Sequence, residues 1–233
     1  PHPEEESVMK HQHFALILAG CGHLDGAEIT EATALNIALS KSGYSVSFYA
    51  PNRLQKETIN HLDGSSTEPP RHILEEAARI ARGTINPIEA LDLSKVDGIA
   101  MAGGFGVIKN FTNFLENGLD ATLQTDIGDK LREALARKTP IIAICAAPMA
   151  LALALKESGI KDASISFGKV ENAGDFLPAL AAWDIVHIPT NIDEAHIDHQ
   201  YALITSGAYM DGEATPFEVF SGAIACVDAF KSL

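Results

Sequence analysis

Basic residues are scarce in this sequence of 233 residues. It carries 17 Lys and Arg against 31 Asp and Glu, which gives a formal net charge of -14 at pH 7. Proteins bind nucleic acids largely through Lys and Arg contacts to phosphate, so an acidic surface opposes such binding. We therefore expect no nucleic-acid partner.

Cysteine is also scarce, and Cys21, Cys145 and Cys226 are the only three in the sequence. They show no pattern of close pairs, so they do not resemble a disulfide framework, and they suit a reducing compartment. The sequence therefore predicts a cytoplasmic protein.

The sequence also lacks an apolar run that is long enough to span a membrane. The stretch PIIAICAAPMALALAL, from Pro140 to Leu155, carries no charge over sixteen residues. A membrane span needs about 20 apolar residues, and Pro140 and Pro148 interrupt the run. We therefore expect no membrane segment.

The first eight residues, PHPEEESV, are polar, precede Met9 and do not resemble a signal peptide. We expect residues 1–8 to be a disordered tail or a remnant of expression cloning. The rest of the chain is long enough to bury one large core, and no low-complexity linker divides it. Residues 9–233 are therefore predicted to form a single domain.

Short apolar runs alternate with longer stretches of helical period. Strands are expected at 14–19, 45–50, 98–102, 140–144 and 201–205, helices at 27–43, 71–83 and 126–138, after Cys145 and at the C-terminus, and polar links at 61–70 and 190–200. The strand segments are almost continuously apolar, which is typical of parallel strands buried on both faces. The alternation predicts an α/β fold with a mostly parallel central sheet covered by helices.

One candidate site lies in IIAICAAP, where a strand runs into a helix through small residues and Cys145 stands at the junction. This is the architecture of a nucleophile elbow, and a helix N-terminus beneath the sulfur is expected to lower the pKa of the thiol. The competing interpretation is a buried structural cysteine, since Cys often behaves as a small hydrophobic residue. The stretch alone leaves both interpretations open.

Two glycine-rich turns follow other strands. In AGGFG, residues 102–106, backbone amides could stabilise an oxyanion, although a plain tight turn explains the glycines equally well. In GCGHLDGAEITE, residues 20–31, Asp25 breaks the dinucleotide-binding fingerprint. Glu28 and Glu31 share a helical face there, and Glu28 is expected to be an ordinary first-turn acid that complements the helix dipole. Cys21, in the same loop, is a weaker rival nucleophile or a redox partner.

Nine histidines raise the question of a metal site. The tight pairs are His11 with His13 and His196 with His199, and neither has the full ligand spacing of a zinc site. We expect solvated histidines and no metal.

Taken together, these segments resemble the ElbB family of isoprenoid-biosynthesis glyoxalases, in the PfpI/ThiJ branch of the class I glutamine amidotransferase-like superfamily. The likeness rests on GCGHLDGAEITEA (20–32), INHLDG (59–64), EAARIARG (76–83), GGFGVIKNFTNF (103–114), CAAPMAL (145–151) and AYM (208–210). It implies a flavodoxin-like three-layer α/β/α sandwich, a homodimer, and no metal or organic cofactor.

The resemblance also implies roles for particular residues. It places Cys145 in the elbow as the nucleophile, Glu31 beside its sulfur, oxyanion donors at Gly104 and Ala146, and Gly103 in the turn; Glu28 is a further substrate-binding candidate. PfpI-type proteases carry a histidine directly after the cysteine, where this sequence has Ala146. Glutamine amidotransferases carry a His-x-Glu pair that completes a catalytic triad, and we assign this role to no residues of this sequence. Protease and glutaminase activities are therefore not expected.

The function implied is a glyoxalase-like lyase. Cys145 would add to glyoxal or a similar small α-oxoaldehyde to form a hemithioacetal, and Glu31 would move a proton so that glycolate is released. A carboxylate beside a thiolate repels it, so the pKa of Glu31 is expected to be high and coupled to Cys145. The alternative is a redox-sensing or binding protein, linked to isoprenoid metabolism or stress response, in which Cys145 is oxidised.

Overall fold

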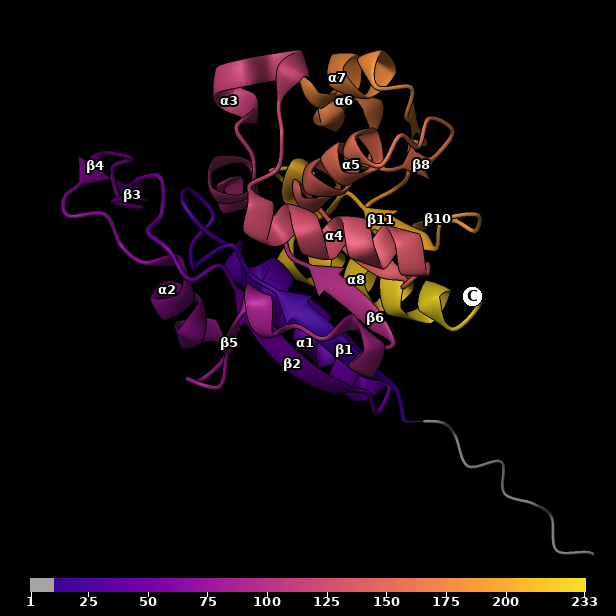
Figure 1. The fold of residues 1–233 in the computed structure, drawn as a ribbon, viewed down its shortest axis with the longest axis horizontal. Helices are drawn as coiled ribbons and strands as arrows, with labels where there is room; N and C mark the ends of the chain where they lie inside the picture. The colour runs from indigo at the N-terminus through magenta and orange to yellow at the C-terminus, as the bar shows by residue number, and fades with distance from the viewer. Residues whose placement is uncertain (1–10) are drawn as a thin grey trace, which may run out of the picture.

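The computed structural model describes residues 11–233, so the tail expected at 1–8 lies outside the described residues. A central seven-stranded sheet runs through this part of the chain, in the order β10-β11-β7-β6-β1-β2-β5 (Figure 1). Its strands are β1 His13–Ile17, β2 Ser45–Ala50, β5 Asn86–Pro87, β6 Gly98–Met101, β7 Ile141–Ile144, β10 His196–Asp198 and β11 Leu203–Ser206. All neighbours are parallel except β10 and β11. The mostly parallel sheet of the prediction is confirmed.

The strands in the middle of the sheet are the most apolar. Every residue of β6 and β7 is buried, as is β1 from its second residue on. In register, Ile17 pairs with Met101 and Met101 pairs with Ala143. These strands therefore end at one edge of the sheet, which is where open α/β folds bind ligands.

Helices flank both faces of the sheet. They are α1 Ile29–Lys41, α2 Ile73–Ile80, α3 Phe114–Asn117, α4 Thr125–Arg137, α5 Ala147–Glu157, α6 Val170–Ala173, α7 Phe176–Ala182 and α8 Pro216–Phe230. Helices α1 and α8 pack on one another, and so do α4 and α5. In Figure 1, α4 lies in front of the strands and α8 behind them. The structure is thus the three-layer sandwich that the resemblance implied.

The ends of the main helices follow from local sequence. Thr215 and Glu218 form a reciprocal capping box at the start of α8. Pro148 lies in the first turn of α5, where its missing N–H removes no helical hydrogen bond. Lys138 ends α4 in a left-handed conformation with φ 56°.

Several short elements were not predicted. The polar link 190–200 contains β10, and the link 61–70 contains β4 (Ser66–Thr67), which pairs with β3 (Thr58–Ile59). The predicted polar links omitted these strands, because antiparallel pairing at an edge needs no apolar run. Strands β8 (Ser164–Ile165) and β9 (Val186–His187) form a third small sheet.

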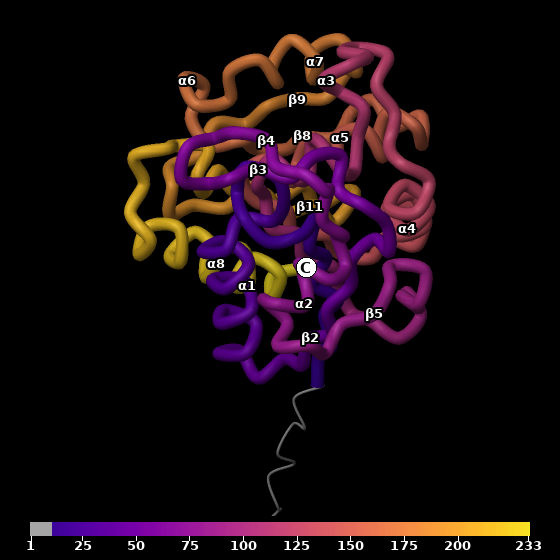
Figure 2. The backbone as a smooth tube through the Cα atoms, turned by 90° about the vertical axis from the view of Figure 1, so that its left-hand side faces the viewer, coloured from indigo at the N-terminus to yellow at the C-terminus, as the bar shows by residue number. Residues whose placement is uncertain are grey.

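Helices α3, α6 and α7 lie together at one end of the molecule (Figures 1 and 2). Phe114 of α3 packs edge-on to Phe176 of α7, with ring centroids 6.0 Å apart, and to Trp183, 6.3 Å away. These aromatic contacts join α3 to α7. One of them, α7, brings Phe176 to the cavity described below.

Two loops at the carboxyl edge of the sheet are bound closely together. Gly106 N donates to Gly26 O at 3.0 Å, Phe105 N to His23 O at 2.8 Å and Glu28 N to Gly103 O at 3.0 Å. A Cβ atom on Gly106 would lie within 2.7 Å of three backbone atoms of Gly26. The glycines at this crossing therefore allow the two backbones to approach.

The crossing predicts that Gly106→Ala destabilises the protein. Gly106 has φ -60°, which alanine adopts freely, so the effect is purely steric. We expect a loss of about 1–3 kcal/mol in the free energy of unfolding, measured by urea denaturation. Gly212→Ala is the matched control, because a Cβ there meets no atom within 4 Å. Equal stability of the two variants would contradict the close approach.

Candidate active site

Cys145 lies between the end of β7 at Ile144 and the start of α5 at Ala147. Its φ is 59°, a left-handed conformation that is uncommon for a residue with a side chain. Its N–H donates to Ser206 O at 3.0 Å, and the residue is 7% exposed. The tight strand-to-helix turn expected for a nucleophile elbow is present, and the strain is held by the surrounding sheet.

Glu31, in the first turn of α1, is completely buried, with 0% exposure. Its Oε1 accepts a hydrogen bond from Gly103 N at 2.9 Å, and its Oε2 accepts one from Tyr209 N at 3.3 Å. The carboxyl group also hydrogen-bonds to the side chain of Cys145. One buried carboxyl thus joins four separate segments of the chain.

The pKa of Glu31 is raised from its usual 4.5 to about 8. Burial is the main cause, because it removes the charged form from water, and the nearby charge of Glu28 adds to it. The hydrogen bonds from Cys145, Tyr209 and Gly103 oppose the shift and are outweighed. The carboxyl is therefore mostly protonated at neutral pH, as the sequence predicted.

The pKa of the Cys145 thiol is raised well above its usual range. Burial is the largest cause, followed by the charge and hydrogen bond of Glu31, while the backbone amides of Gly104 and Ala146 act in the opposite direction. The expected lowering by the helix N-terminus was wrong, because burial and a neighbouring acid outweigh those amides. The thiol and carboxyl titrate as a coupled pair.

The remaining site residues of the sequence analysis lie around this pair. A Cβ atom on Gly103 would lie 2.6 Å from Cys145 Cβ and 2.7 Å from Glu31 Oε1. Gly104 has φ 100°, which favours glycine, and its amide reaches the thiol together with that of Ala146. The structure therefore brings Cys145, Glu31 and all three backbone candidates together.

Glu28 precedes α1 and caps it. Its Oε2 accepts a hydrogen bond from Glu31 N at 2.6 Å, which is the ordinary first-turn role that the sequence favoured. The same residue also lines the cavity above Cys145. It thus stabilises the helix and faces the candidate site.

A cavity of about 510 Å3 opens above Cys145. It is lined by His23, Glu28, Gly104, Phe105, Ile108, Cys145, Ala146, Phe176, Tyr209, Met210 and Gly212. Sequence reasoning assigned no role to His23, Phe105, Tyr209 or Met210, although each stands within a segment that carries the family resemblance. His23 shows that an imidazole reaches the cavity even though none follows the cysteine.

Lys109 and Asn110 of the same resemblance hold the first glycine-rich loop in place. Asn110 Nδ2 donates to Ala19 O at 3.0 Å and to Asp25 O at 3.1 Å. Lys109 Nζ donates to Leu24 O at 2.7 Å. These side chains lie in the π-helix η3, Val107–Phe111, which periodicity does not reveal.

The other candidates lie outside this cavity. Cys21 is half-buried in a polar hollow with Asp25 and His61, and its pKa is raised, mainly by burial. The ring of His196 hydrogen-bonds to Ser164 Oγ at 2.7 Å, so this histidine is not simply solvated as expected. Within residues 11–233, no group of three or more His, Cys, Asp or Glu side chains could hold a metal ion.

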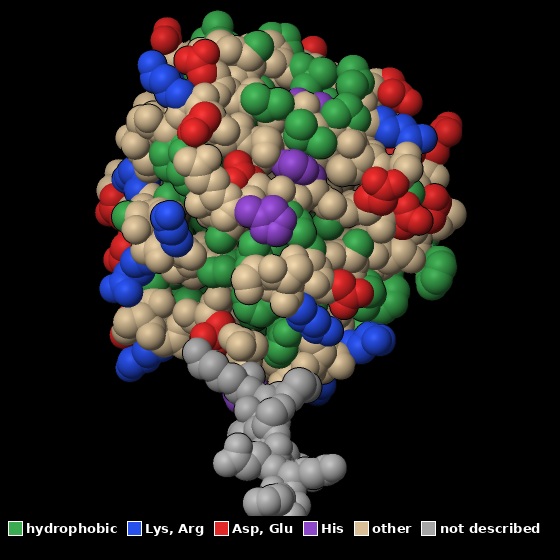
Figure 3. All heavy atoms as spheres, turned by 90° about the vertical axis from the view of Figure 1, so that its right-hand side faces the viewer, with side chains coloured by type: hydrophobic (Ala, Val, Ile, Leu, Met, Phe, Trp, Pro, Cys, Tyr) green, Lys and Arg blue, Asp and Glu red, His purple; other side chains and the backbone are tan. Residues whose placement is uncertain are grey.

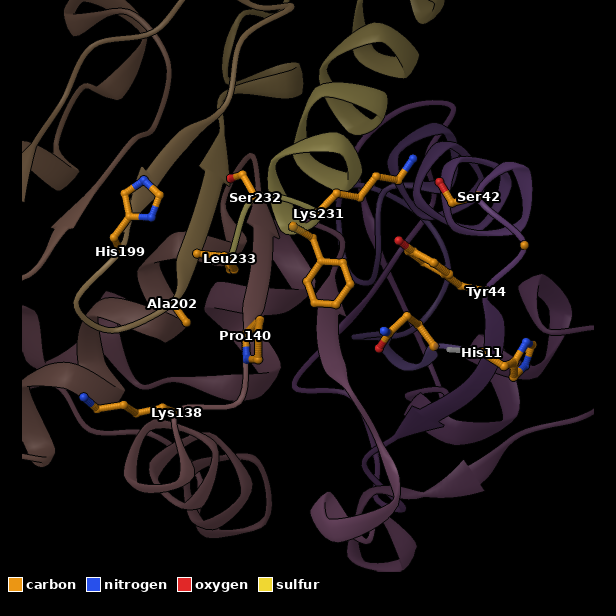
Figure 4. A pocket seen from close by; sticks show the side chains of 13 residues that line it. His11, Ser42, Tyr44, Lys138, Pro140, His199, Ala202, Lys231, Ser232 and Leu233 are labelled. Carbon is orange, nitrogen blue, oxygen red and sulfur yellow. The ribbon is translucent and has the colours of Figure 1, made fainter. Parts of the chain in front are cut away.

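A larger hollow, about 930 Å3, lies near the start of β1 and the end of α8 (Figure 4). His11, Tyr44, Lys138 and Lys231 line it. Its lining residues Pro140 and Ala202 precede β7 and β11, so it lies at the edge where these strands begin, whereas Cys145 follows the end of β7. Its described lining residues include no Cys, Asp or Glu. The volume of this hollow does not by itself indicate a catalytic site.

On the face shown in Figure 3, acidic and basic side chains are interspersed around the rim, and histidines lie nearer the middle. No broad basic surface is visible on this face. Within the described residues, no helix combines the length and apolar character needed to cross a membrane.

The strand-to-helix cysteine, its buried acid partner and the mostly parallel sheet define a class of protein, the class I glutamine amidotransferase-like fold with an elbow thiol. No protein-family model matches the chain. The human protein named "Glutamine amidotransferase-like class 1 domain-containing protein 3, mitochondrial" is 35% identical over 203 residues, which cover 84% of this chain and 74% of that protein.

Among solved structures, an isoprenoid biosynthesis protein with an amidotransferase-like domain from Ehrlichia chaffeensis is 29% identical, with a TM-score of 0.85 over 94% of this chain and 99% of that one. Glyoxalase III from Candida albicans shares the fold at 11% identity, with a TM-score of 0.58 over 95% of this chain and 96% of that one. The chain belongs to the class I glutamine amidotransferase-like superfamily and, within it, to the ElbB-like family that the sequence predicted.

The raised pKa of Glu31 predicts a pH-dependent effect of Glu31→Gln on stability. Folding forces the carboxyl to bind a proton, so wild-type stability declines as pH rises from 4.5 to 8, the unfolded and folded pKa values. Glutamine at this position takes up no proton on folding, so the variant does not lose stability in this way. We expect the variant to be the more stable protein at pH 7, by on the order of 3 kcal/mol.

Urea denaturation at pH 5 and pH 8 measures this effect. The difference in the free energy of unfolding between Glu31→Gln and wild type should be larger at pH 8 than at pH 5. Glu116 is an exposed acid on α3, and Glu116→Gln should show no such increase. A difference that is the same at both pH values would contradict the raised pKa.

Proposed function

We propose that this protein is a cofactor-independent glyoxalase-type enzyme that converts glyoxal, or a similar α-oxoaldehyde, to the 2-hydroxy acid. The observation that carries the proposal is the hydrogen-bonded pair of Cys145 and Glu31 at the base of an open cavity. A thiol that adds to an aldehyde needs no leaving group, so a histidine acid is not required. The pair supplies a nucleophile and a group that moves protons.

The first step forms a carbon–sulfur bond. As Cys145 Sγ attacks one aldehyde carbon, ionised Glu31 accepts the thiol proton and the carbonyl π electrons move to oxygen. The amides of Gly104 and Ala146, which hydrogen-bond to the sulfur, would hold this oxygen. Glu31 then returns the proton to oxygen, which gives the hemithioacetal.

The next steps move hydrogen between the two carbons. Glu31 removes the C–H proton of the hemithioacetal carbon to form an enediolate, and then delivers it to the neighbouring carbon to give a glycolyl thioester. One carbon is oxidised and the other reduced, so no external oxidant is needed. Water hydrolyses the thioester to glycolate and restores the thiol of Cys145.

Other chemistries are less well supported. Ala146 occupies the position of the PfpI protease histidine. His196 and Asp198 lie in β10, where they hydrogen-bond to Ser164, and they do not line the Cys145 cavity. Oxidation and aldehyde addition both need the thiolate of Cys145, whose pKa is raised. Addition is favoured because Glu31, hydrogen-bonded to the thiol, can accept its proton during the attack. The lyase classification, homodimer and cytoplasmic location stay predictions.

Activity toward glyoxal should depend on both members of the pair. We expect Cys145→Ala and Glu31→Gln each to lower kcat/KM by at least about 1000-fold, measured as glycolate formed, because each removes a group that reacts in every turnover. Wild-type kcat/KM should rise with pH up to about 8, as Glu31 becomes able to accept the thiol proton.

Cys21→Ala is the matched control, because Cys21 lies in the separate polar hollow. It should retain wild-type turnover. The mechanism is wrong if Cys145→Ala converts glyoxal as fast as wild type, or if Cys21→Ala is the variant that loses activity. Selective oxidation of Cys145 by low peroxide, in a protein that barely turns over glyoxal, would favour the redox sensor.

A further inference from the structure

The cavity above Cys145 is much larger than glyoxal, which has only four non-hydrogen atoms. Its volume is about 510 Å3, the share of roughly 17 water molecules at about 30 Å3 each. Cavities of this size usually enclose much larger ligands. With glyoxal bound at Cys145, most of the space would hold water.

The walls away from the thiol are apolar. The apolar residues are Phe105 of the second glycine-rich turn, Ile108 of η3, Phe176 of α7 and Met210 of the 3-10 helix Ala208–Met210 that follows β11. Phe105 is 52% exposed, although large aromatic side chains usually bury most of their surface. Water against such walls is displaced favourably by an apolar group.

The charges around the cavity disfavour an anionic ligand. None of its described lining residues is Lys or Arg, while the acidic residue Glu28 lines it. The nearest cation over Phe105 is Lys109, whose Nζ is 5.6 Å from the ring centroid and is already paired with Glu57 at 2.6 Å. A phosphorylated or carboxylated aldehyde would find no lysine or arginine among the described lining residues to pair with its charge.

We propose that the site takes a neutral α-oxoaldehyde with an aromatic or branched apolar body, R–CO–CHO, in preference to glyoxal; this rests on the proposed function. The aldehyde carbon meets Cys145 Sγ, and R packs against Phe105, Phe176 and Met210. His23 and Tyr209 offer polar groups to the second carbonyl. The overall reaction is R–CO–CHO plus water to R–CH(OH)–COOH. No described lining residue is a lysine or arginine that would retain the anionic product, which favours its release.

Turnover of glyoxal, methylglyoxal and phenylglyoxal tests this specificity. We expect kcat/KM for phenylglyoxal to exceed that for glyoxal by at least about 10-fold, the scale that filling part of an apolar pocket produces. Phe105→Ala should reduce the phenylglyoxal-to-glyoxal ratio by about 10-fold. The matched control is Phe217→Ala, an aromatic of α8 that is 73% exposed and does not line the cavity, and it should keep the wild-type ratio.

A second measurement does not depend on catalysis. Binding of 1-phenyl-1,2-ethanediol and of ethylene glycol, neutral and unreactive analogues, is compared by titration calorimetry. The phenyl diol should bind at least about 10-fold more tightly, with a negative heat-capacity change, and Phe105→Ala should remove this advantage.

The outcomes separate the two proposals. If no aldehyde is converted but the phenyl diol binds through Phe105, the proposed reaction fails and the ligand class stands. If glyoxal is converted faster than phenylglyoxal and the two diols bind equally, the reaction stands and the ligand class is overturned. The ligand class is also overturned if a second copy of the chain covers the cavity, so that phenyl diol binding weakens as protein concentration rises.

Discussion

The buried carboxyl of Glu31 is the constraint around which the active-site edge is arranged. A carboxyl without access to water must be hydrogen-bonded from inside the protein. The partners are Gly103 N, Tyr209 N and the thiol of Cys145, which come from loops after three different strands. Gly103 must lack a side chain for the carboxyl and the cysteine to meet. The carboxyl of Glu31 thus fixes the relative positions of the three loops that carry these partners.

The architecture was largely readable from the sequence, for a definite reason. Strands buried on both faces require continuous apolar runs, and parallel strands place all their carboxyl ends at one edge. The loops that follow 14–19, 98–102 and 140–144 therefore had to converge, which brought Cys145, Glu31 and Gly104 together. The family resemblance supplied their roles, because spacing alone left Cys145 equally compatible with a structural cysteine.

Other properties could not be read in this way. The pKa of Cys145 depends on how deeply the sulfur is buried and on the distance of an acid from another part of the chain, so the local helix gave the wrong direction. The cavity wall depends on α7, whose Phe176 packs against Phe114 of α3 and lines the same cavity as Phe105. The edge strand β10 is short and polar, and only its pairing with β11 defines it.

Two unfavourable features fall on residues in contact. Cys145 holds a positive φ, and Glu31 must take up a proton to remain buried. Glutamine at position 31 would satisfy the same amide of Gly103 without the protonation penalty, so stability alone does not account for a glutamate. A raised carboxyl pKa near the working pH is what proton transfer to and from a thiol adduct requires. The proposed reactivity would account for strain and a destabilising acid at one point, since a site that serves only packing needs neither.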